Sequence, residues 1–401
     1  MVIPKKIWCV KEQHPVLQHI LSRELSISRI TAQLLINRGI YTTEHARAFL
    51  DSDLGGLYDP SLLEDLDRAA NRIETAVIMK EKILVYGDYD ADGVTGTALL
   101  VQVLRRLGGD VRYYIPDRLE EGYGLHLEAL QKAKDEGITL VITVDCGTGS
   151  LSEASWAAGN GLDLVITDHH EPPAEIPKAY ALINPKRPDS AYPFKELAGV
   201  GVALKLAFAL FRRIGATPEG WLDYLDLACI GTIADLVPLL GENRILVKNG
   251  LKAIASTRNQ GLAALISLCG VKLESLGARE VGFILAPRLN AAGRISSANQ
   301  AVELLLTENP DLAREIASQL HRGNQDRQGI ESEVLNKALQ MHGEDPDSAE
   351  QPGDSAGGGR MAPWRDRHRS LPHGRQVPPP GAAYSAWKGC GQGFGARHSR
   401  F

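Results

Sequence analysis

The amino-acid sequence predicts an α/β protein with a doubly wound parallel sheet, flanking helical regions and a disordered C-terminal tail. Three observations lead to this prediction. Short β-branched and aliphatic runs alternate with helical spacings between residues 82 and 183, which is the signature of repeated βαβ units. Apolar residues outside that stretch recur mainly at helical spacing. Residues 351–401 contain only Leu371 and Val377 as branched aliphatic residues, too few to offset the entropy of ordering the segment.

These patterns divide the chain into four regions. Residues 1–78 are expected to form an N-terminal helical region, 79–240 the α/β domain, 241–345 a helical region with a connecting helix, and 346–401 the tail. The predicted strands, in order, are Ile83–Tyr86, Val111–Ile115, Leu140–Val144, Leu164–Thr167 and Tyr180–Ile183. The predicted helices of the α/β domain are Val94–Leu107, Leu125–Asp135, Leu151–Asn160, Val202–Ile214 and Trp221–Ile233.

Composition narrows the class of protein. The chain has 401 residues, of which 44% are hydrophobic and 23% charged, as in ordinary globular proteins. No apolar run reaches the roughly 20 residues that a membrane span requires, so we expect a cytoplasmic protein without a membrane partner. The formal net charge of −5 gives no global attraction to nucleic acid, although a local basic strip would be enough to bind it.

Acidic residues follow the first predicted strand closely. Asp88, Asp90 and Asp92 lie in the block Tyr86–Gly93. We expect Asp90 and Asp92 to alternate at the end of the strand and to point into one crevice. Asp88 is either a third ligand or a group that orients the others. The alternative is an acidic turn or a helix N-cap, because both are common uses of aspartate.

Similar polar residues end two later strands and one helical run. Asp145 follows Leu140–Val144, and His169 and His170 follow the fourth predicted strand. Asp235 is a single acid in an apolar run, which requires a metal or an arginine partner if it is buried. Because the carboxyl ends of parallel strands meet along one edge, these side chains are expected to surround one site.

Carboxylates with imidazole suit divalent ions such as Mn²⁺ or Mg²⁺. Two such ions would activate a water and stabilise both oxygens of an in-line displacement at phosphorus, which predicts phosphoester or phosphoanhydride hydrolysis. The sequence contains no glycine-rich phosphate loop that ends in Lys-Ser/Thr and no Gly-x-Ser-x-Gly elbow between a predicted strand and helix, which disfavours a nucleoside triphosphatase and a serine hydrolase.

The four polar blocks resemble the four motifs of the DHH phosphoesterase superfamily: Gly87–Gly93, Val144–Gly147, Thr167–His170 and Gly231–Asp235. Within that superfamily the chain is similar to the RecJ family of single-strand-specific DNA exonucleases. This closer similarity depends on Ile115–Arg118, Glu121–Leu125, Ala198–Ala203 and Pro287–Arg294. The resemblance covers roughly residues 80 to 340.

The resemblance implies removal of nucleotides from the 5′ end of single-stranded DNA in recombination and repair, with two Mn²⁺ or Mg²⁺ ions as cofactors. It also implies single-strand-binding protein and a helicase as partners. By motif position it implies the metal ligands Asp90, Asp92, Asp145, His169 and Asp235, with Asp88 and His170 as catalytic groups that support them or contact phosphate. It further implies strand contacts by Arg118, Tyr123, Arg288, Asn290 and Arg294.

The tail departs from that family. Its members carry a further substrate-binding domain, called DHHA1, whose Gly-Gly-His signature is not legible here, since Gly357–Gly359 precedes Arg360. With suitable codons, Met361–Leu371 and Gly391–Arg397 read one nucleotide downstream resemble pieces of that domain. We therefore expect a frameshifted tail in place of the domain, and weakened exonuclease activity.

Two other functions stay open at this point. A phosphodiesterase of the same superfamily acting on short oligonucleotides or cyclic dinucleotides would use the same metals. A non-catalytic DNA-binding or scaffold protein on the same fold is disfavoured, because every ligand position is filled.

Overall fold

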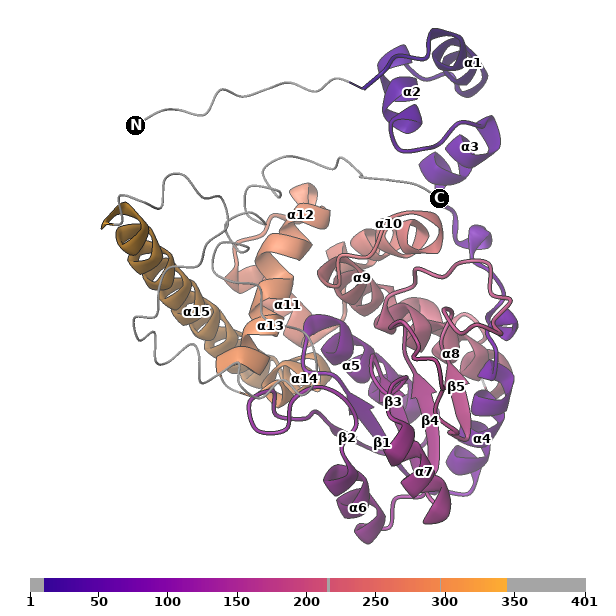
Figure 1. Ribbon diagram of the computed structural model, residues 1–401, viewed down its shortest axis with the longest axis vertical. Helices are drawn as coiled ribbons and strands as arrows, with labels where there is room; N and C mark the ends of the chain where they lie inside the picture. Colours follow the sequence, from indigo (N-terminus) through magenta and orange to yellow (C-terminus); the bar gives the residue numbers. More distant parts are fainter. Residues whose placement is uncertain (1–10, 215–216, 296, 345–401) are drawn as a thin grey trace.

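A five-stranded parallel sheet forms the centre of the protein in the computed structural model, which describes residues 11–214, 217–295 and 297–344 (Figure 1). The strands lie in the order β2-β1-β3-β4-β5, and every neighbouring pair is parallel. Their bounds are β1 (Lys82–Gly87), β2 (Asp110–Tyr114), β3 (Leu140–Val144), β4 (Asp163–Thr167) and β5 (Ala181–Ile183). The predicted α/β class and the doubly wound parallel sheet are confirmed.

This strand order fixes where a ligand can bind. The chain goes from β1 outward to β2, then returns across the sheet to β3, so the winding direction reverses between β1 and β3. At such a reversal the connections leave a crevice beyond the carboxyl ends of the strands. The register aligns Gly87 with Val144 and Val144 with Thr167, so the three strands end at the same level.

Helices cover both faces of the sheet because alternate strand residues point to opposite sides. Ile83 and Val85 belong to the larger core, and Leu84 and Tyr86 to a smaller core on the other face. Helices α4 (Leu66–Ile78), α5 (Ala91–Arg106) and α8 (Gly199–Ile214) bury side chains in the larger core. Helices α6 (Leu127–Asp135) and α7 (Leu151–Gly159) bury theirs in the smaller one.

The chain after α8 is helical and packs beside α5 and α8 (Figure 1). Its elements are η3 (Gly220–Tyr224), α9 (Leu225–Ala234), α10 (Gly241–Ala255), α11 (Gln260–Leu268), η4 (Leu273–Ser275), α12 (Ala278–Glu280), η5 (Val281–Leu285), α13 (Ala286–Ile295), α14 (Asn299–Leu306) and α15 (Pro310–Glu344). One turn, η5, is a π-helix that runs directly into α13. The predicted tail, residues 346–401, lies outside the described residues.

The described N-terminal helices form a small unit above the sheet in Figure 1. These are α1 (Pro15–Leu25), α2 (Arg29–Ile36) and α3 (Thr43–Asp51), followed by the short turns η1 (Leu54–Gly56) and η2 (Pro60–Leu62). Helices α1, α2 and α3 share a hydrophobic cluster that is separate from the two cores of the sheet. Side chains of α10 hold the carbonyls at the end of α3: Lys248 Nζ donates to Leu50 O at 2.7 Å, and Asn249 Nδ2 to Ser52 O at 3.0 Å.

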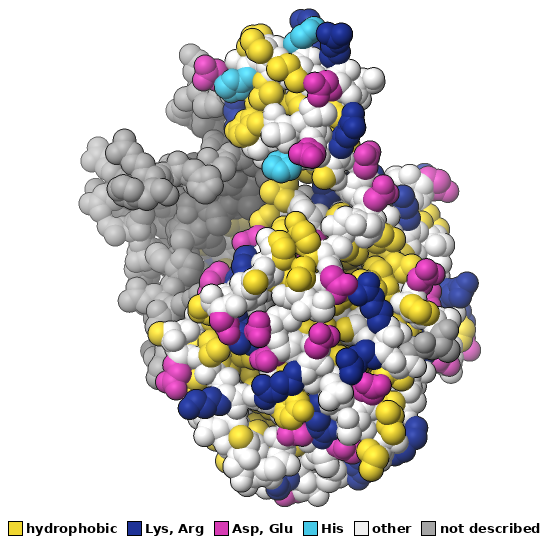
Figure 2. Space-filling model, turned by 90° about the vertical axis from the view of Figure 1, so that its right-hand side faces the viewer, with side chains coloured by type: hydrophobic (Ala, Val, Ile, Leu, Met, Phe, Trp, Pro, Cys, Tyr) yellow, Lys and Arg dark blue, Asp and Glu magenta, His cyan; other side chains and the backbone are white. Residues whose placement is uncertain are grey.

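Charges on the surface are mixed. On the described part of the face drawn in Figure 2, Lys and Arg side chains are interspersed with Asp and Glu side chains, without a continuous basic surface. Among the described helices, none combines the length and apolar character needed to cross a bilayer.

Candidate metal centre

Three neighbouring strand ends bring the predicted acids and histidines together. Asp88 follows β1, Asp145 follows β3, and His169 and His170 follow β4. Asp235 reaches the same edge from the C-terminal end of α9. The centre therefore forms at the reversal between β1 and β3, where the topology leaves a crevice.

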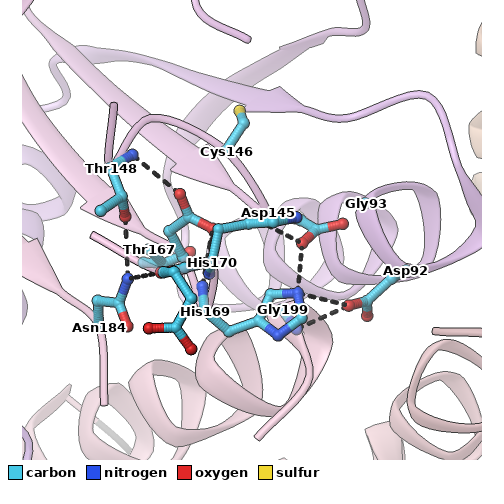
Figure 3. A network of polar contacts seen from close by, with 12 residues as sticks. Asp92, Gly93, Asp145, Cys146, Thr148, Thr167, His169, His170, Asn184 and Gly199 are labelled. Carbon is cyan, nitrogen blue, oxygen red and sulfur yellow. Dashed lines mark hydrogen bonds and ion pairs between the residues drawn. The ribbon is translucent and has the colours of Figure 1, made fainter. Parts of the chain in front are cut away.

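The His169 imidazole lies among three carboxylates, and Figure 3 shows those of Asp145 and Asp92 beside it. Its Nε2 is 3.1 Å from Asp145 Oδ1, 3.6 Å from Asp235 Oδ2 and 3.8 Å from Asp92 Oδ2. Neither His169 Nε2 nor Asp145 Oδ1 makes a hydrogen bond within the described structure, although both are buried. Buried nitrogen and oxygen atoms that lack hydrogen-bond partners and converge on a common point are the arrangement expected of metal ligands.

The structure corrects the expected placement of Asp90 and Asp92. β1 ends at Gly87, and Asp90 is the N-cap of α5, where its Oδ1 accepts from the N–H groups of Asp92 at 2.9 Å and Gly93 at 3.1 Å. Asp92 lies inside the first turn of α5 rather than at a strand end. Asp90 thus serves as the cap foreseen in the alternative and also lies beside Asp88 and Asp145.

Asp92 is held by the beginning of another helix. Its Oδ2 accepts from Gly199 N at 2.7 Å and its Oδ1 from Val200 N at 2.9 Å, at the N-terminus of α8. The positive end of that helix favours a carboxylate there. Gly199 is required by packing, because a Cβ at this position would lie 2.7 Å from Asp145 Oδ1.

The described His, Asp and Glu side chains form three groups that could hold a metal ion, each with its ligand atoms within 4.8 Å of one another. These groups are Asp88, Asp90 and Asp145; Asp92, His169 and Asp235; and Asp145, His169 and His170. Asp145 and His169 each belong to two groups, so the structure brings all five predicted ligands and both predicted catalytic residues together.

The electrostatics of the cluster show the cost of leaving it without a cation. Burial, followed by the negative charge of Asp90, raises the pKa of Asp88 to about 8. Burial and the neighbouring aspartates also raise the pKa of Asp92 and Asp145 well above the ordinary value of 3.8. Burial lowers the pKa of His169 to about 4, so this imidazole is neutral at pH 7 and cannot offset the carboxylates.

The donor set fits divalent metal ions. Asp88 Oδ1, Asp145 Oδ1 and His169 Nε2 are buried without hydrogen-bond partners, and buried polar atoms are normally satisfied. Carboxylate oxygens with imidazole nitrogen are suited to Mn²⁺ and related ions, which would supply the missing positive charge. No arginine or lysine among the described side chains forms an ion pair with Asp235, which disfavours the alternative of an arginine partner.

Asp168 was not singled out from the sequence, although it lies directly before the two histidines. Its buried carboxylate accepts from Thr148 N at 2.8 Å, from His169 N at 2.7 Å and from His170 Nδ1 at 2.8 Å. Although burial opposes ionisation, the His170 and Thr148 contacts hold the pKa of Asp168 near 2. Asn184 extends the network, since its Nδ2 donates to Thr148 Oγ1 at 3.0 Å and to His170 O at 2.9 Å (Figure 3).

Two of the predicted strand contacts lie on the loop between β2 and α6. Tyr123 Oη is 3.1 Å from His170 Nδ1 and donates to Asp145 O at 3.2 Å, so it adjoins the centre. The Arg118 guanidinium lies over the Tyr89 ring, 4.8 Å from its centroid. Tyr89 belongs to the first acidic block, so Arg118 is also beside the centre.

The other three predicted strand contacts belong to α13. Arg288 Nε donates to His321 Nδ1 on α15 at 3.0 Å, and its Nη1 to Ile284 O. Asn290 Oδ1 accepts from Ala91 N at 2.7 Å, a contact within the protein. The side chain of Arg294 lies outside the described residues.

Comparisons with known proteins agree with this geometry. Residues 82–232 match the family model described as "DHH family, N-terminal domain". The "Single-stranded-DNA-specific exonuclease RecJ" of Bacillus subtilis is 45% identical over 341 residues, which are 85% of this chain and 43% of that protein. The protein of the same name from Thermus thermophilus is 42% identical over 285 residues, 70% of this chain and 41% of that protein.

Solved structures are similar as well. The "Crystal structure of exonuclease RecJ bound to manganese" shares 42% sequence identity, covers 71% of each chain and gives a TM-score of 0.65. The Mn²⁺ complex of RecJ from Thermus thermophilus gives a TM-score of 0.72 at 36% identity, over 84% of this chain and 48% of that one. The chain therefore spans about half the length, or less, of several relatives that it matches.

Proposed function

Because the chain belongs to the RecJ family of DHH phosphoesterases, we propose that it hydrolyses single-stranded DNA from the 5′ end with Mn²⁺ or Mg²⁺ at the candidate metal centre. The observation that carries the proposal is the convergence of five aspartates and two histidines at one sheet edge, with buried ligand atoms left unpaired.

The proposed metal ligands are Asp90, Asp92, Asp145, His169 and Asp235, with Asp88 beside them. Two bound divalent ions would activate water and stabilise the entering and leaving oxygens at phosphorus. The chain's own contribution is to align these ligands. The amides at the start of α8 orient the Asp92 carboxylate and offset part of the rise in its pKa, and burial keeps His169 neutral.

His170 is the proposed phosphate contact. Although burial opposes protonation, the hydrogen bond to Asp168 raises the pKa of His170, so the ring is more often cationic than an isolated histidine at the same pH. Its Nδ1 is engaged by Asp168 and Tyr123, which leaves Nε2 as the atom that can donate to a phosphate oxygen or to the leaving oxygen.

Arg118, Tyr123, Arg288 and Arg294 are the proposed strand contacts. Arg118 and Tyr123 adjoin the centre, as expected for groups that hold the phosphate backbone near the reacting bond. The sequence also predicted Asn290 as a strand contact, but its side-chain amide oxygen accepts a hydrogen bond from Ala91 N.

The wider setting is proposed from the family. We propose a role in DNA recombination and repair, action in the cytoplasm, and cooperation with single-strand-binding protein and a helicase. We also propose residues 79–240 as the catalytic domain and 241–345 as a helical region that supports it, which the family match over 82–232 supports.

The test is Mn²⁺-dependent release of nucleotides from 5′- and 3′-labelled single-stranded DNA, beside dinucleotide and cyclic-dinucleotide substrates. The Asp145→Ala, His169→Ala double variant should be inactive. A matched control is Asp135→Ala, since Asp135 is exposed and ends the helix that leads into the amino end of β3.

Progressive release from the 5′ label, lost only in the double variant, is the expected result. Preferential turnover of dinucleotides would favour the short-substrate phosphodiesterase instead. Retained DNA binding without turnover of any phosphodiester would favour the non-catalytic alternative. A rate far below that of a full-length relative would support the expectation of weakened activity.

A further inference from the structure

We propose that α13 holds the metal-binding loop, defined as residues 88–93, in position, and that Asn290 is a positioning residue for the metal ligands rather than a strand contact. This inference rests on the proposed function only in taking the centre to be a metal site. It concerns how residues about two hundred positions away in the sequence fix the first acidic block.

The N-terminus of α5 takes one of its hydrogen-bond acceptors from α13. The first N–H groups of any helix lack partners within the helix and must find them elsewhere. Asp90 Oδ1 accepts from Asp92 N and Gly93 N, but not from the first helical residue, Ala91. Asn290 Oδ1 supplies that acceptor at 2.7 Å. Ala91 is only 1% exposed, so water does not readily replace the amide oxygen.

Helix α13 also approaches the loop closely one turn after Asn290, at Gly293. A Cβ at Gly293 would lie 2.7 Å from Tyr89 O, closer than real side chains come to a backbone oxygen. Asn290 and Gly293 are three residues apart and thus share one face of the helix. They contact Ala91 and Tyr89, the residues on either side of Asp90 in the sequence, so this face of α13 packs directly against the loop that carries the proposed ligands.

Helix α13 is itself held from its other side by α15. Arg288 Nε donates to His321 Nδ1 on α15 at 3.0 Å, and α13 lies between α5 and α15 in Figure 1. The loop is therefore backed by a helix that is itself fixed. Asp90 and Asp92 owe part of their orientation to this support, as metal ligands commonly depend on the groups behind them.

The experiment measures Mn²⁺ binding to the metal-free protein by calorimetry, without DNA. Asn290→Ala is expected to weaken Mn²⁺ binding by about 10- to 100-fold, the usual effect of removing a group that orients a ligand. Asn290→Asp keeps an acceptor oxygen, so its Mn²⁺ affinity should stay within about threefold of the wild-type value, a smaller loss than that expected for Asn290→Ala. Gly293→Ala should weaken binding in the same direction as Asn290→Ala, because its methyl group would displace Tyr89.

Asn299→Ala is the matched control, because Asn299 is an exposed asparagine at the start of α14 whose Nδ2 donates to Ser297 Oγ. It should leave Mn²⁺ affinity unchanged. If Asn290→Ala also leaves Mn²⁺ affinity unchanged and weakens only the binding of single-stranded DNA, the strand-contact role is correct and the inference is overturned.

If the variants fail to fold, a second measurement on the wild-type protein still tests the inference. In the wild-type metal-free protein, the Ala91 amide should be as protected from hydrogen exchange as the Asp92 and Gly93 amides. Rapid exchange of Ala91 alone would overturn the inference. Wild-type protein that binds no Mn²⁺ would instead overturn the proposed function, so the two failures are distinguishable.

Discussion

Replacing Asp145 by asparagine is expected to stabilise the metal-free protein while removing its stabilisation by Mn²⁺. Asp145 is 2% exposed, and its Oδ1 has no hydrogen-bond partner. Burial and the charges of its neighbours raise its pKa well above the ordinary value, so the ionised form is unfavourable in the folded protein. Asparagine has nearly the same shape and tolerates the left-handed backbone found here, at φ 63°.

The magnitude follows from the spacing of the carboxylates. Asp88, Asp90 and Asp145 have ligand atoms within 4.8 Å of one another. At that separation and an effective dielectric constant of about 20, two negative charges repel by about 3.5 kcal/mol. Proton uptake relieves part of this repulsion, so we expect the variant to gain about 2 kcal/mol at pH 8. Wild-type protein should gain about 2.7 kcal/mol from Mn²⁺ at one hundred times its dissociation constant.

The assay is urea unfolding followed by circular dichroism, in EDTA and in excess Mn²⁺. Asp168→Asn is the matched control, because Asp168 is equally buried but its carboxylate is satisfied by backbone N–H groups and by His170. That control should destabilise the protein in EDTA. The reasoning is refuted if Asp145→Asn destabilises the metal-free protein as much as Asp168→Asn does.

Four further predictions concern pH and single contacts. The pKa of Asp88 rises from 3.8 to about 8 on folding, so the folded protein holds this proton more tightly than the unfolded chain does. The metal-free protein should therefore lose stability as pH rises from about 4 to 8, which urea unfolding in EDTA would measure. Asp168 should give the opposite pH dependence, because its pKa falls from 3.8 to about 2 on folding. Its contribution of about 2 kcal/mol to the stability of the folded protein should disappear as pH falls from 3.8 to about 2, which acid titration of the circular dichroism signal would measure. Glu242→Ala should cost about 3–5 kcal/mol, since it leaves the buried Lys205 ammonium without the carboxylate 2.6 Å away; a loss under 1 kcal/mol in urea would contradict this. Tyr123→Phe removes a hydroxyl that donates to Asp145 O and lies beside His170. This variant should lower kcat/KM by about tenfold while Mn²⁺ affinity stays unchanged. Kinetics equal to those of the wild-type protein would show that the hydroxyl is dispensable.

The sequence determined the fold and which side chains meet at the candidate metal centre. Strand and helix periodicities are local, so the five strands and the helices between them could be placed within a few residues of their observed bounds. Parallel strands end at one edge, so acids and histidines after β1, β3 and β4 had to meet there once that order of elements formed. Asp88, Asp145 and His169 are therefore readable from the chain alone.

Only the tertiary structure decided which distant groups hold the side chains of the site. Asp92 was taken up by the amides that begin α8, and the Asn290 oxygen was engaged by Ala91. These partners lie more than one hundred residues and about two hundred residues away in the sequence, respectively. Local periodicity reports which face a residue occupies but not which donor from a distant segment reaches it, because that depends on how the helices pack.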